Sequence, residues 1–240
     1  MSSRQPGRSV ARSVSLAGLA AAGLVLTGCG VSTGIHPGSA AVIGDESISL
    51  SKIDTTASRY CQAYAPQISQ QSQRVPMRYL RQFVAANLSQ RMLGRQLAEA
   101  YDVQPTSAYD QQVTKVETQF ASSPSKLRKA VVDVEAGGLY LSAVQAAIGQ
   151  KLLAESGTSS PTAKAARQRG QVATEDWLKD HSISLDPVLG IAADGGQFKA
   201  TTDQTSYPLS TLASQGAAAA GASQPDPAYT AALTPSQVCG

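Results

Sequence analysis

The chain has 240 residues and a formal net charge of +3, and 42% of its residues are hydrophobic, 15% charged and 5% aromatic, a balance that favours a small helical domain with tails over a globular enzyme. Three arginines fall within residues 1–28, so the rest of the chain carries 17 basic against 17 acidic side chains and lacks the clustered cations that bind nucleic acid. Two histidines and three cysteines are too few for a multi-histidine metal site or a zinc ribbon, and we expect no metal or cofactor.

Residues 1–28 are predicted to be a cleaved lipoprotein signal peptide. A basic stretch precedes an apolar run at residues 14–26, which is shorter than the roughly 20 residues that span a bilayer. The tetrapeptide LTGC at residues 26–29 resembles the bacterial lipobox, which implies that Cys29 is acylated, with chains such as palmitate, and becomes the first residue. Two or three acyl chains give a stable anchor. We therefore expect a lipoprotein at the outer face of the cytoplasmic membrane, the alternative being an uncleaved signal with an incidental cysteine.

Export also affects the interpretation of the other two cysteines, Cys61 and Cys239. They would lie in a compartment that can be oxidising, and an even pair suggests a disulfide bond between them. The alternative is that Cys61 is an inert buried thiol on a helix and that Cys239 is unpaired. A catalytic thiol is not expected, because neither cysteine is flanked by a histidine or a basic residue.

The first part of the mature chain is predicted to be a tether followed by a small β element and a helix. Residues 29–40 are small and polar, which is typical of a flexible linker. Residues 41–50 contain two short β-prone pieces around Gly44 and Asp45, which predicts a hairpin or a bent strand. Ser51 then opens a helix that Pro66 is expected to end.

Amphipathic helices are predicted for most of the next 90 residues. The clearest covers residues 76–101, where apolar side chains recur at helical spacing between arginines and glutamines. A shorter helix begins at Pro105, and another runs from Pro124 to Leu152. Paired glycines cost about 2 kcal/mol relative to alanine in a helix. We therefore expect the last of these segments to be two helices that meet near Gly138.

A final helix and a strand are predicted to close the domain. After a loop at residues 156–161, Thr162 starts a helix, and residues 183–186 alternate apolar and polar side chains like a half-buried strand. From residue 191 the chain is rich in Gly, Ala, Ser, Gln and Pro, with too little apolar surface to offset the entropy of ordering. The prediction is a folded domain at residues 41–190 and a low-complexity, largely disordered tail at residues 191–240.

This order of elements is similar to the N-terminal chaperone domain of the SurA and PrsA family of exported foldases. The resemblance is carried by residues 41–49 with 53–54, which are similar to the family's Gly-Asp strand entering a helix. It is also carried by residues 177–178 with 183–190, which are similar to a Trp-bearing helix feeding a strand. The resemblance implies a mainly α domain with a small β ribbon that pairs the two ends of the domain.

The chain departs from this family at the position of the proline isomerase domain. Full-length members also carry parvulin-type domains, whereas the expected insertion point holds only the loop at residues 156–161. A parvulin active site needs histidines, and the only two here are His36 in the tether and His181 at a helix end. A cationic His181 would suit the negative end of its helix, and we interpret it as a cap. Isomerase activity should therefore be absent.

No other catalytic constellation is present in the sequence. The adjacent carboxylates Asp45-Glu46 and Glu175-Asp176 diverge on a strand or a helix, so solvation at the surface is the favoured interpretation over paired acid and base. Nucleophile-elbow, Walker and zinc-protease motifs are all missing. We expect that the protein is not an enzyme.

The apolar side chains of the helix at residues 76–101 leave two roles open. Met77, Phe83, Val84 and Met92 form a stripe that any helix in a bundle needs for its core. If part of the stripe is exposed, methionine and aromatic groups would suit a promiscuous apolar partner.

Three hypotheses about function follow from these features. The first is a lipid-anchored, chaperone-like module that binds unfolded or partly folded exported polypeptides without isomerising them. The second is a structural or assembly lipoprotein of the envelope with one dedicated protein partner. The third, a hydrolase or transferase, would need a catalytic constellation that the sequence lacks.

Replacement of Cys29 by serine tests the anchor. The Cys29→Ser protein should accumulate as a precursor without acyl chains or be released, because Cys29 holds the only thiol in the lipobox-like tetrapeptide. Metabolic labelling with a fatty acid measures this directly. Labelling that survives the substitution would refute the assignment.

Overall fold

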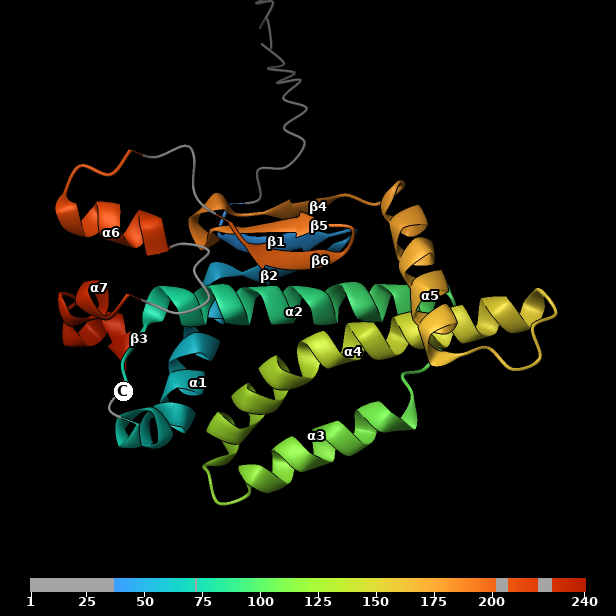
Figure 1. Cartoon of the computed structure of the whole chain (residues 1–240), viewed down its shortest axis with the longest axis horizontal. Coiled ribbons are helices and arrows are strands. Elements are labelled where there is room, and N and C mark those ends of the chain that lie inside the picture. Colours follow the sequence, from blue (N-terminus) through green and yellow to red (C-terminus); the bar gives the residue numbers. More distant parts are fainter. Residues whose placement is uncertain (1–36, 72, 202–206, 220–225) are drawn as a thin grey trace, which may run out of the picture. The chain divides into compact units, whose positions relative to one another are not determined.

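The computed structural model describes residues 37–240 except residue 72 and residues 202–206 and 220–225. Within these residues the protein is mainly helical with small antiparallel sheets, as Figure 1 shows, which confirms the predicted fold class. The predicted signal peptide, Cys29 and the tether as far as residue 36 lie outside the described residues.

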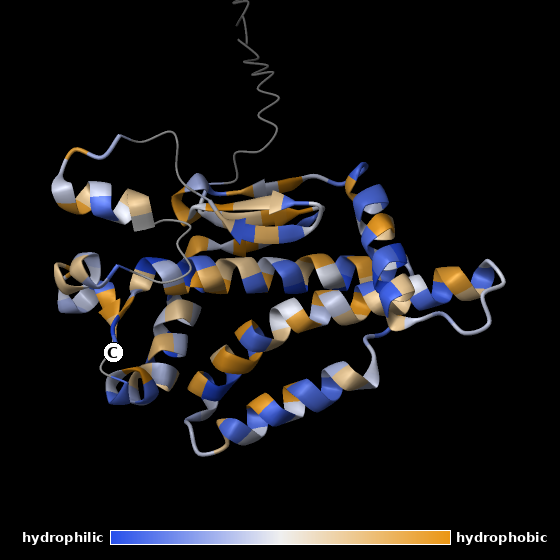
Figure 2. Ribbon diagram, in the orientation of Figure 1, coloured by the Kyte–Doolittle hydropathy of each residue, from blue (hydrophilic) through white to orange (hydrophobic). Residues whose placement is uncertain are grey.

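The elements follow one another closely in the chain. In order they are β1 (Ser39–Ile43), β2 (Glu46–Ser49), α1 (Leu50–Gln70), β3 (Val75–Pro76), α2 (Met77–Ala100), α3 (Ser107–Gln119), α4 (Ser125–Glu155), α5 (Ala163–Leu178), β4 (Ile183–Leu185), the 3-10 turn η1 (Pro187–Leu189), β5 (Ile191–Asp194), β6 (Gln197–Ala200), α6 (Thr211–Ala219), α7 (Pro227–Ala231), η2 (Pro235–Gln237) and β7 (Val238–Cys239). The prediction of helices beginning near residues 76, 124 and 162 is confirmed. Figure 2 shows hydrophobic and hydrophilic residues interspersed along α2 and α4, as in helices with one buried face.

The largest sheet joins the two ends of the predicted domain. Its strand order is β2-β1-β4, and β1 is antiparallel to both neighbours. Ala41 lies opposite Leu185 and Ile43 opposite Ile183, so the predicted pairing of residues 41–50 with the strand after the last helix is confirmed. Gly44 turns the β1–β2 hairpin with a φ of 53°, which glycine adopts at no steric cost. The buried face of β1 packs against α2.

Helix α1 continues past Pro66 to Gln70, so the prediction that Pro66 ends it is wrong. A proline inside a helix removes one backbone hydrogen bond and crowds the preceding turn. The last turn is retained because Ile68 packs against the hydrophobic core and lies against Gly240 at the end of the chain. The Ile68 carbonyl also accepts hydrogen bonds from the backbone N–H groups of Gln71 and Gln73.

Helix α4 is continuous through Gly137 and Gly138, so the predicted break is also wrong. A Cβ atom at position 137 would overlap the backbone carbonyl of Asn87 in α2. The same relation holds between α4 and α5, where Gly149 lies against the Ala166 carbonyl and Gly170 against the carbonyl of Gln145. The helix tolerates its glycines because they let two neighbouring helices approach its backbone, and the packing gained offsets their low propensity.

By length and composition, α4 is the one described helix that could cross a membrane. The core helix of a folded domain meets the same criterion. Here α4 packs against α1, α2, α3 and α5, and its buried residues include Val131, Val134, Val144 and Ile148. We therefore describe α4 as the central helix of the hydrophobic core.

The described part of residues 191–240 is ordered, so the predicted disorder is wrong there. Strands β5 and β6 form a hairpin in which Ile191 and Phe198 are only 5% and 6% exposed. Gly195 and Gly196 turn this hairpin with φ values of 54° and 83°. The segment is poor in apolar residues, but each of these two reaches a different cluster of the core. Ordering needs only a few such anchors when a folded surface is already present.

The C-terminal residues are also held on the domain. Val238 and Cys239 form β7, which pairs with β3 immediately before α2. The Sγ atoms of Cys61 and Cys239 are 2.08 Å apart, which is disulfide distance, and the two residues are separated by 178 positions. Closing a loop of this length would stabilise the fold by about 5 kcal/mol in the chain-entropy treatment, an upper figure because unfolded chains retain structure.

Adjacent glycines in α4 provide a test of the close helix contact. Gly137→Ala should lower the free energy of unfolding by about 1–3 kcal/mol, because the new methyl group overlaps the backbone of α2. Gly138→Ala is the matched control, since its methyl group meets only side-chain ends of Gln90 and Asn87. It should be neutral or add up to about 1 kcal/mol through helix propensity. Urea unfolding measures both, and equal destabilisation would contradict the packing argument.

Candidate functional site

A groove of about 540 Å³ lies between β2, α2 and the first half of α4. We call it the β2 groove. Its lining residues are Ser47, Ile48, Ser49, Lys52, Leu88, Arg91, Met92, Arg95, Lys129 and Asp133. It is therefore assembled from four elements, β2, the start of α1, α2 and α4, whose lining residues are up to 86 positions apart in the sequence, from Ser47 to Asp133.

One wall of the β2 groove is the open edge of a sheet. Strand β2 is the outer strand in the order β2-β1-β4, and Figure 1 shows it beside α2. Residues 47–49 all line the groove, whereas one face of a strand presents only every second residue. The backbone edge of β2 therefore borders the groove, and edge N–H and C=O groups are able to pair with another extended chain.

The floor of the β2 groove is apolar. Leu88 and Met92 lie one turn apart on α2 and are 8% and 3% exposed. Ile48 of β2 is half-buried and packs against both hydrophobic clusters of the core. A methionine and two branched side chains form a surface that adapts to apolar groups of different shape.

The rim of the groove is basic, with four cationic side chains against two carboxylates. Arg91 Nη1 lies 2.7 Å from Asp133 Oδ1, and Lys129 Nζ lies 3.0 Å from Asp133 Oδ2. Arg95 pairs with Glu46 of β2. Lys52, exposed at the start of α1, adds a further positive charge.

The ion pairs of the rim differ in how exposed they are. The side chain of Lys129 is 73% exposed and that of Arg95 is 56% exposed. Only the Arg95–Glu46 pair is exposed on both sides, and such pairs contribute about 0–1 kcal/mol, so an acidic ligand is able to compete for Arg95. Asp133, the partner of Arg91 and Lys129, is only 15% exposed. The groove thus combines a free strand edge, an apolar floor and excess positive charge, which together suit an extended polypeptide with apolar and acidic side chains.

A second cluster of ionisable groups lies between α1 and α4. The hydroxyl of Tyr60 donates a hydrogen bond to Glu135, and the hydroxyl of Tyr64 donates one of 3.2 Å to the same carboxylate oxygen. Burial, together with Glu135, raises the pKa of Tyr60 far above its usual value and that of Tyr64 to about 12. The rings pack on each other and on Phe120 and Phe83. Raised values keep both phenols neutral, which suits a core contact and does not favour a nucleophile or base.

The residues that the sequence singled out as charged or polar candidates are dispersed over the surface. The Nδ1 atom of His181 lies 2.8 Å from the carbonyl oxygen of Trp177, and its ring stacks on the indole at 3.7 Å, which places it at the end of α5 as expected of a cap. Glu46 pairs with Arg95, and Asp176 lies 2.7 Å from Lys179.

No group of three or more His, Cys, Asp or Glu side chains able to hold a metal ion occurs among the residues that the structure describes.

The apolar stripe on α2 is partly buried in the core and partly exposed, so its residues serve both of the roles that the sequence left open, core packing and an exposed apolar surface. Val84 and Met92 are buried, Met77 is half-buried, and Phe83 is 41% exposed. Met92 serves both as core and as the floor of the β2 groove. The sequence analysis did not single out the basic rim, although Arg91 and Arg95 are one helical turn apart and so share a face of α2.

The chain was compared with family models, with characterised proteins and with solved structures, and no significant match was found in any of the three comparisons.

The Tyr60–Glu135 contact predicts that the free energy of unfolding depends on pH in the alkaline range. The unfolded phenol titrates near pH 10, whereas the folded one stays protonated, so the unfolded state loses its proton first and the free energy of unfolding falls as pH rises above about 10. In the Tyr60→Phe variant this fall should be shallower, by up to about 1.4 kcal/mol per pH unit. Below pH 9, denaturation curves of the two proteins should differ by a constant offset. Parallel behaviour through pH 11 would contradict the assignment.

Proposed function

We propose that the protein is a lipid-anchored, chaperone-like module that binds unfolded or partly folded exported polypeptides at the outer face of the cytoplasmic membrane, without isomerising prolines. The observation that carries the proposal is the β2 groove, where the edge of a strand borders an apolar floor and a basic rim. Backbone pairing at a strand edge is insensitive to the sequence of the added chain. An adaptable floor adds affinity for many apolar side chains.

The position of the groove suits a tethered protein. Strand β1 begins at Ser39, ten residues after Cys29, and β2 follows it directly. A linker of this length would keep the groove within a few nanometres of an anchored Cys29. Polypeptides that emerge from the membrane would meet the groove while they are still extended.

The proposal also draws on the resemblance to the SurA and PrsA chaperone domain. The pairing of β1 with β4 gives the closed arrangement that the resemblance implies. The connection between α4 and α5 is short, with α4 ending at Glu155 and α5 beginning at Ala163, and so leaves no room for an isomerase domain there.

Charge reversal at the rim tests the function. A chain starting at residue 30 should suppress the aggregation of a reduced acidic protein such as α-lactalbumin. The double variant Lys52→Glu/Lys129→Glu should need about tenfold more protein for the same effect, because two rim cations become repulsive. Light scattering follows the aggregation.

The matched control is Lys164→Glu/Arg167→Glu, which makes the same change in charge on the exposed surface of α5. It should behave like the unaltered protein. Equal loss in both double variants would show that net charge acts instead of the groove. Failure of the unaltered protein to suppress any client, combined with capture of one envelope protein by the groove, would favour the dedicated-partner hypothesis.

A further inference from the structure

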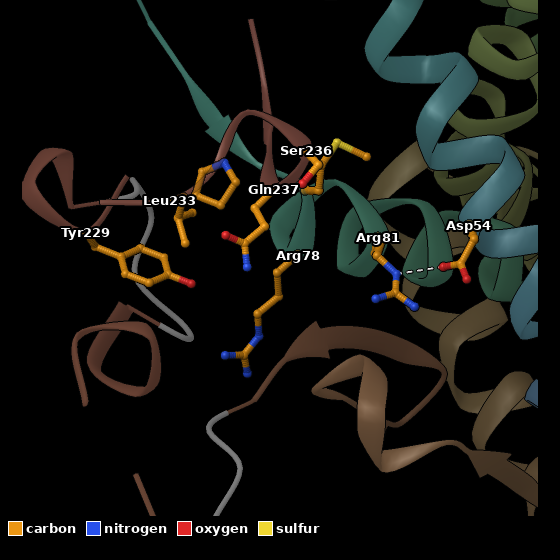
Figure 3. Close-up of a pocket in the computed structure, with 9 residues that line it drawn as sticks. Asp54, Arg78, Arg81, Tyr229, Leu233, Ser236 and Gln237 are labelled. Atoms are coloured by element: carbon orange, nitrogen blue, oxygen red, sulfur yellow. Dashed lines mark ion pairs between the residues drawn. The ribbon is translucent and has the colours of Figure 1, made fainter. Parts of the chain in front are cut away.

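A second pocket, of about 430 Å³, lies between the first turn of α2 and the C-terminal segment (Figure 3). We call it the C-terminal pocket. It is lined by Met77, Arg78, Tyr229, Leu233, Ser236 and Gln237, together with Asp54, Pro76 and Arg81. It shares no residue with the β2 groove.

The far wall of this pocket is held in place by contacts of the last residues with the core. Tyr229, Leu233 and Val238 form a small hydrophobic cluster against Tyr79 of α2. The pairing of β7 with β3 and the Cys61–Cys239 contact secure the end of the same segment. The pocket is therefore a built feature of the folded chain.

Within the described residues, one cation of the C-terminal pocket has no acidic partner. Arg78 Nη1 is 3.5 Å from the carbonyl oxygen of Gly216, and no acidic side chain of the described residues pairs with it. The neighbouring Arg81 differs, since its Nε atom lies 2.7 Å from Asp54 Oδ1. Figure 3 shows the Arg81–Asp54 pair at one end and the guanidinium of Arg78 apart from it. The half-buried Arg78 thus leaves its charge for another group.

The start of α2 adds to this positive potential. Pro76 caps the helix without a side-chain hydrogen bond, and the first turn holds no acidic residue. The N-terminal end of a 24-residue helix carries a partial positive charge that favours an anion. An arginine there is unfavourable unless a negative group is nearby. The one carboxylate that lines the pocket, Asp54, pairs with Arg81 and not with Arg78. Both features point to an anionic ligand.

Neutral polar groups and apolar walls complete the pocket. The Tyr229 hydroxyl lies close to Gly216, whose carbonyl oxygen is also near Arg78, so the phenol and the guanidinium share one side of the space. Figure 3 shows the Gln237 amide pointing into the same region. Met77 and Leu233 contribute apolar surface. The N–H fork of a guanidinium suits the oxygens of a carboxylate and of a phosphate alike. The single positive charge of Arg78, which no described acidic residue balances, matches one carboxylate more closely than a phosphate that carries up to two negative charges.

We propose that the C-terminal pocket binds a carboxylate attached to a small apolar group, with Arg78 as its charged partner. Two sources share this chemistry, namely the C-terminal carboxylate of a polypeptide and a free small acid. The proposal does not depend on the β2 groove, because the two sites use different residues.

The test uses the mature chain and two pairs of probes. N-acetyl-leucine and its amide represent a free acid, and the tripeptide Ala-Ala-Leu with a free or an amidated C-terminus represents a polypeptide end. Isothermal titration should show that each acid that binds does so about tenfold or more tightly than its amide. If the tripeptide acid binds as well as N-acetyl-leucine, the natural ligand is the C-terminus of a polypeptide. If only N-acetyl-leucine binds, the natural ligand is a free small acid. Equal binding of acids and amides, or no binding at millimolar concentration, overturns the proposal.

Two variants test whether the acid probes bind in the C-terminal pocket. Arg78→Gln should weaken binding of the acids about tenfold or more, and the control Arg167→Gln, on the exposed surface of α5, should leave it unchanged. Gln237→Glu places a negative charge in the pocket while it keeps the side-chain oxygen that accepts from Thr234, so the turn should still form. It too should weaken binding. Affinity at the level of the unaltered protein in both variants refutes the assignment.

The outcome is separate from that of the β2 groove. Lys52→Glu/Lys129→Glu should bind the carboxylate probes normally, and Arg78→Gln should still suppress aggregation. Loss of both activities in Arg78→Gln would show that the substitution disrupts the fold. Binding of the acids to Gln237→Glu would then test the pocket, since weaker binding supports the proposal and unchanged binding refutes it.

Discussion

Helix α4 packs backbone to backbone against both α2 and α5, and this close contact fixes the arrangement of the helical core. Gly137 and Gly149 of α4 and Gly170 of α5 each lie against a backbone carbonyl of a neighbouring helix. The Cβ atom of a larger residue there would overlap that carbonyl and push the helices apart. Protein interiors are packed too densely to absorb such a change locally. The three helices therefore form one unit around which the other elements are arranged.

Helix α2 connects this unit to both candidate binding sites. One face of α2 is buried against α4 and the sheet, which leaves its arginines on the other faces. Arg78 lies at the start of the helix in the C-terminal pocket, whereas Arg91 and Arg95 lie farther along at the β2 groove. The ends of the described chain supply the facing walls, β2 for the groove and residues 229–237 for the pocket. A single helix thus contributes to two candidate binding sites of different chemistry.

The ordered C-terminal segment shows how few apolar anchors a polar stretch needs. Tyr229, Leu233 and Val238 are its buried hydrophobic residues before Cys239, and they cluster on Tyr79. The surface that they contact already exists, so ordering costs only the entropy of the segment itself. A Cys61–Cys239 cross-link reduces the number of conformations open to the unfolded chain, so less conformational entropy is lost when the segment becomes ordered. A segment rich in Ala, Gly and Ser is therefore able to adopt a fixed structure when buried residues and a disulfide attach it to a folded domain.

Local sequence signals predicted where several helices and strands of this protein begin. Helical periodicity located α2, Thr162 marked the start of α5 where its hydroxyl caps the Ala165 N–H, and the alternation at residues 183–186 indicated β4. These signals are local because a helix or strand arises from neighbouring residues. Tertiary contacts instead explain why α4 passes through Gly137, why α1 passes Pro66 and why the described parts of the tail are ordered. They also bring β2, α1, α2 and α4 together around a groove. Each of those outcomes depends on contacts between residues far apart in the chain, whose packing energy outweighs the local propensity of a glycine, a proline or a polar stretch.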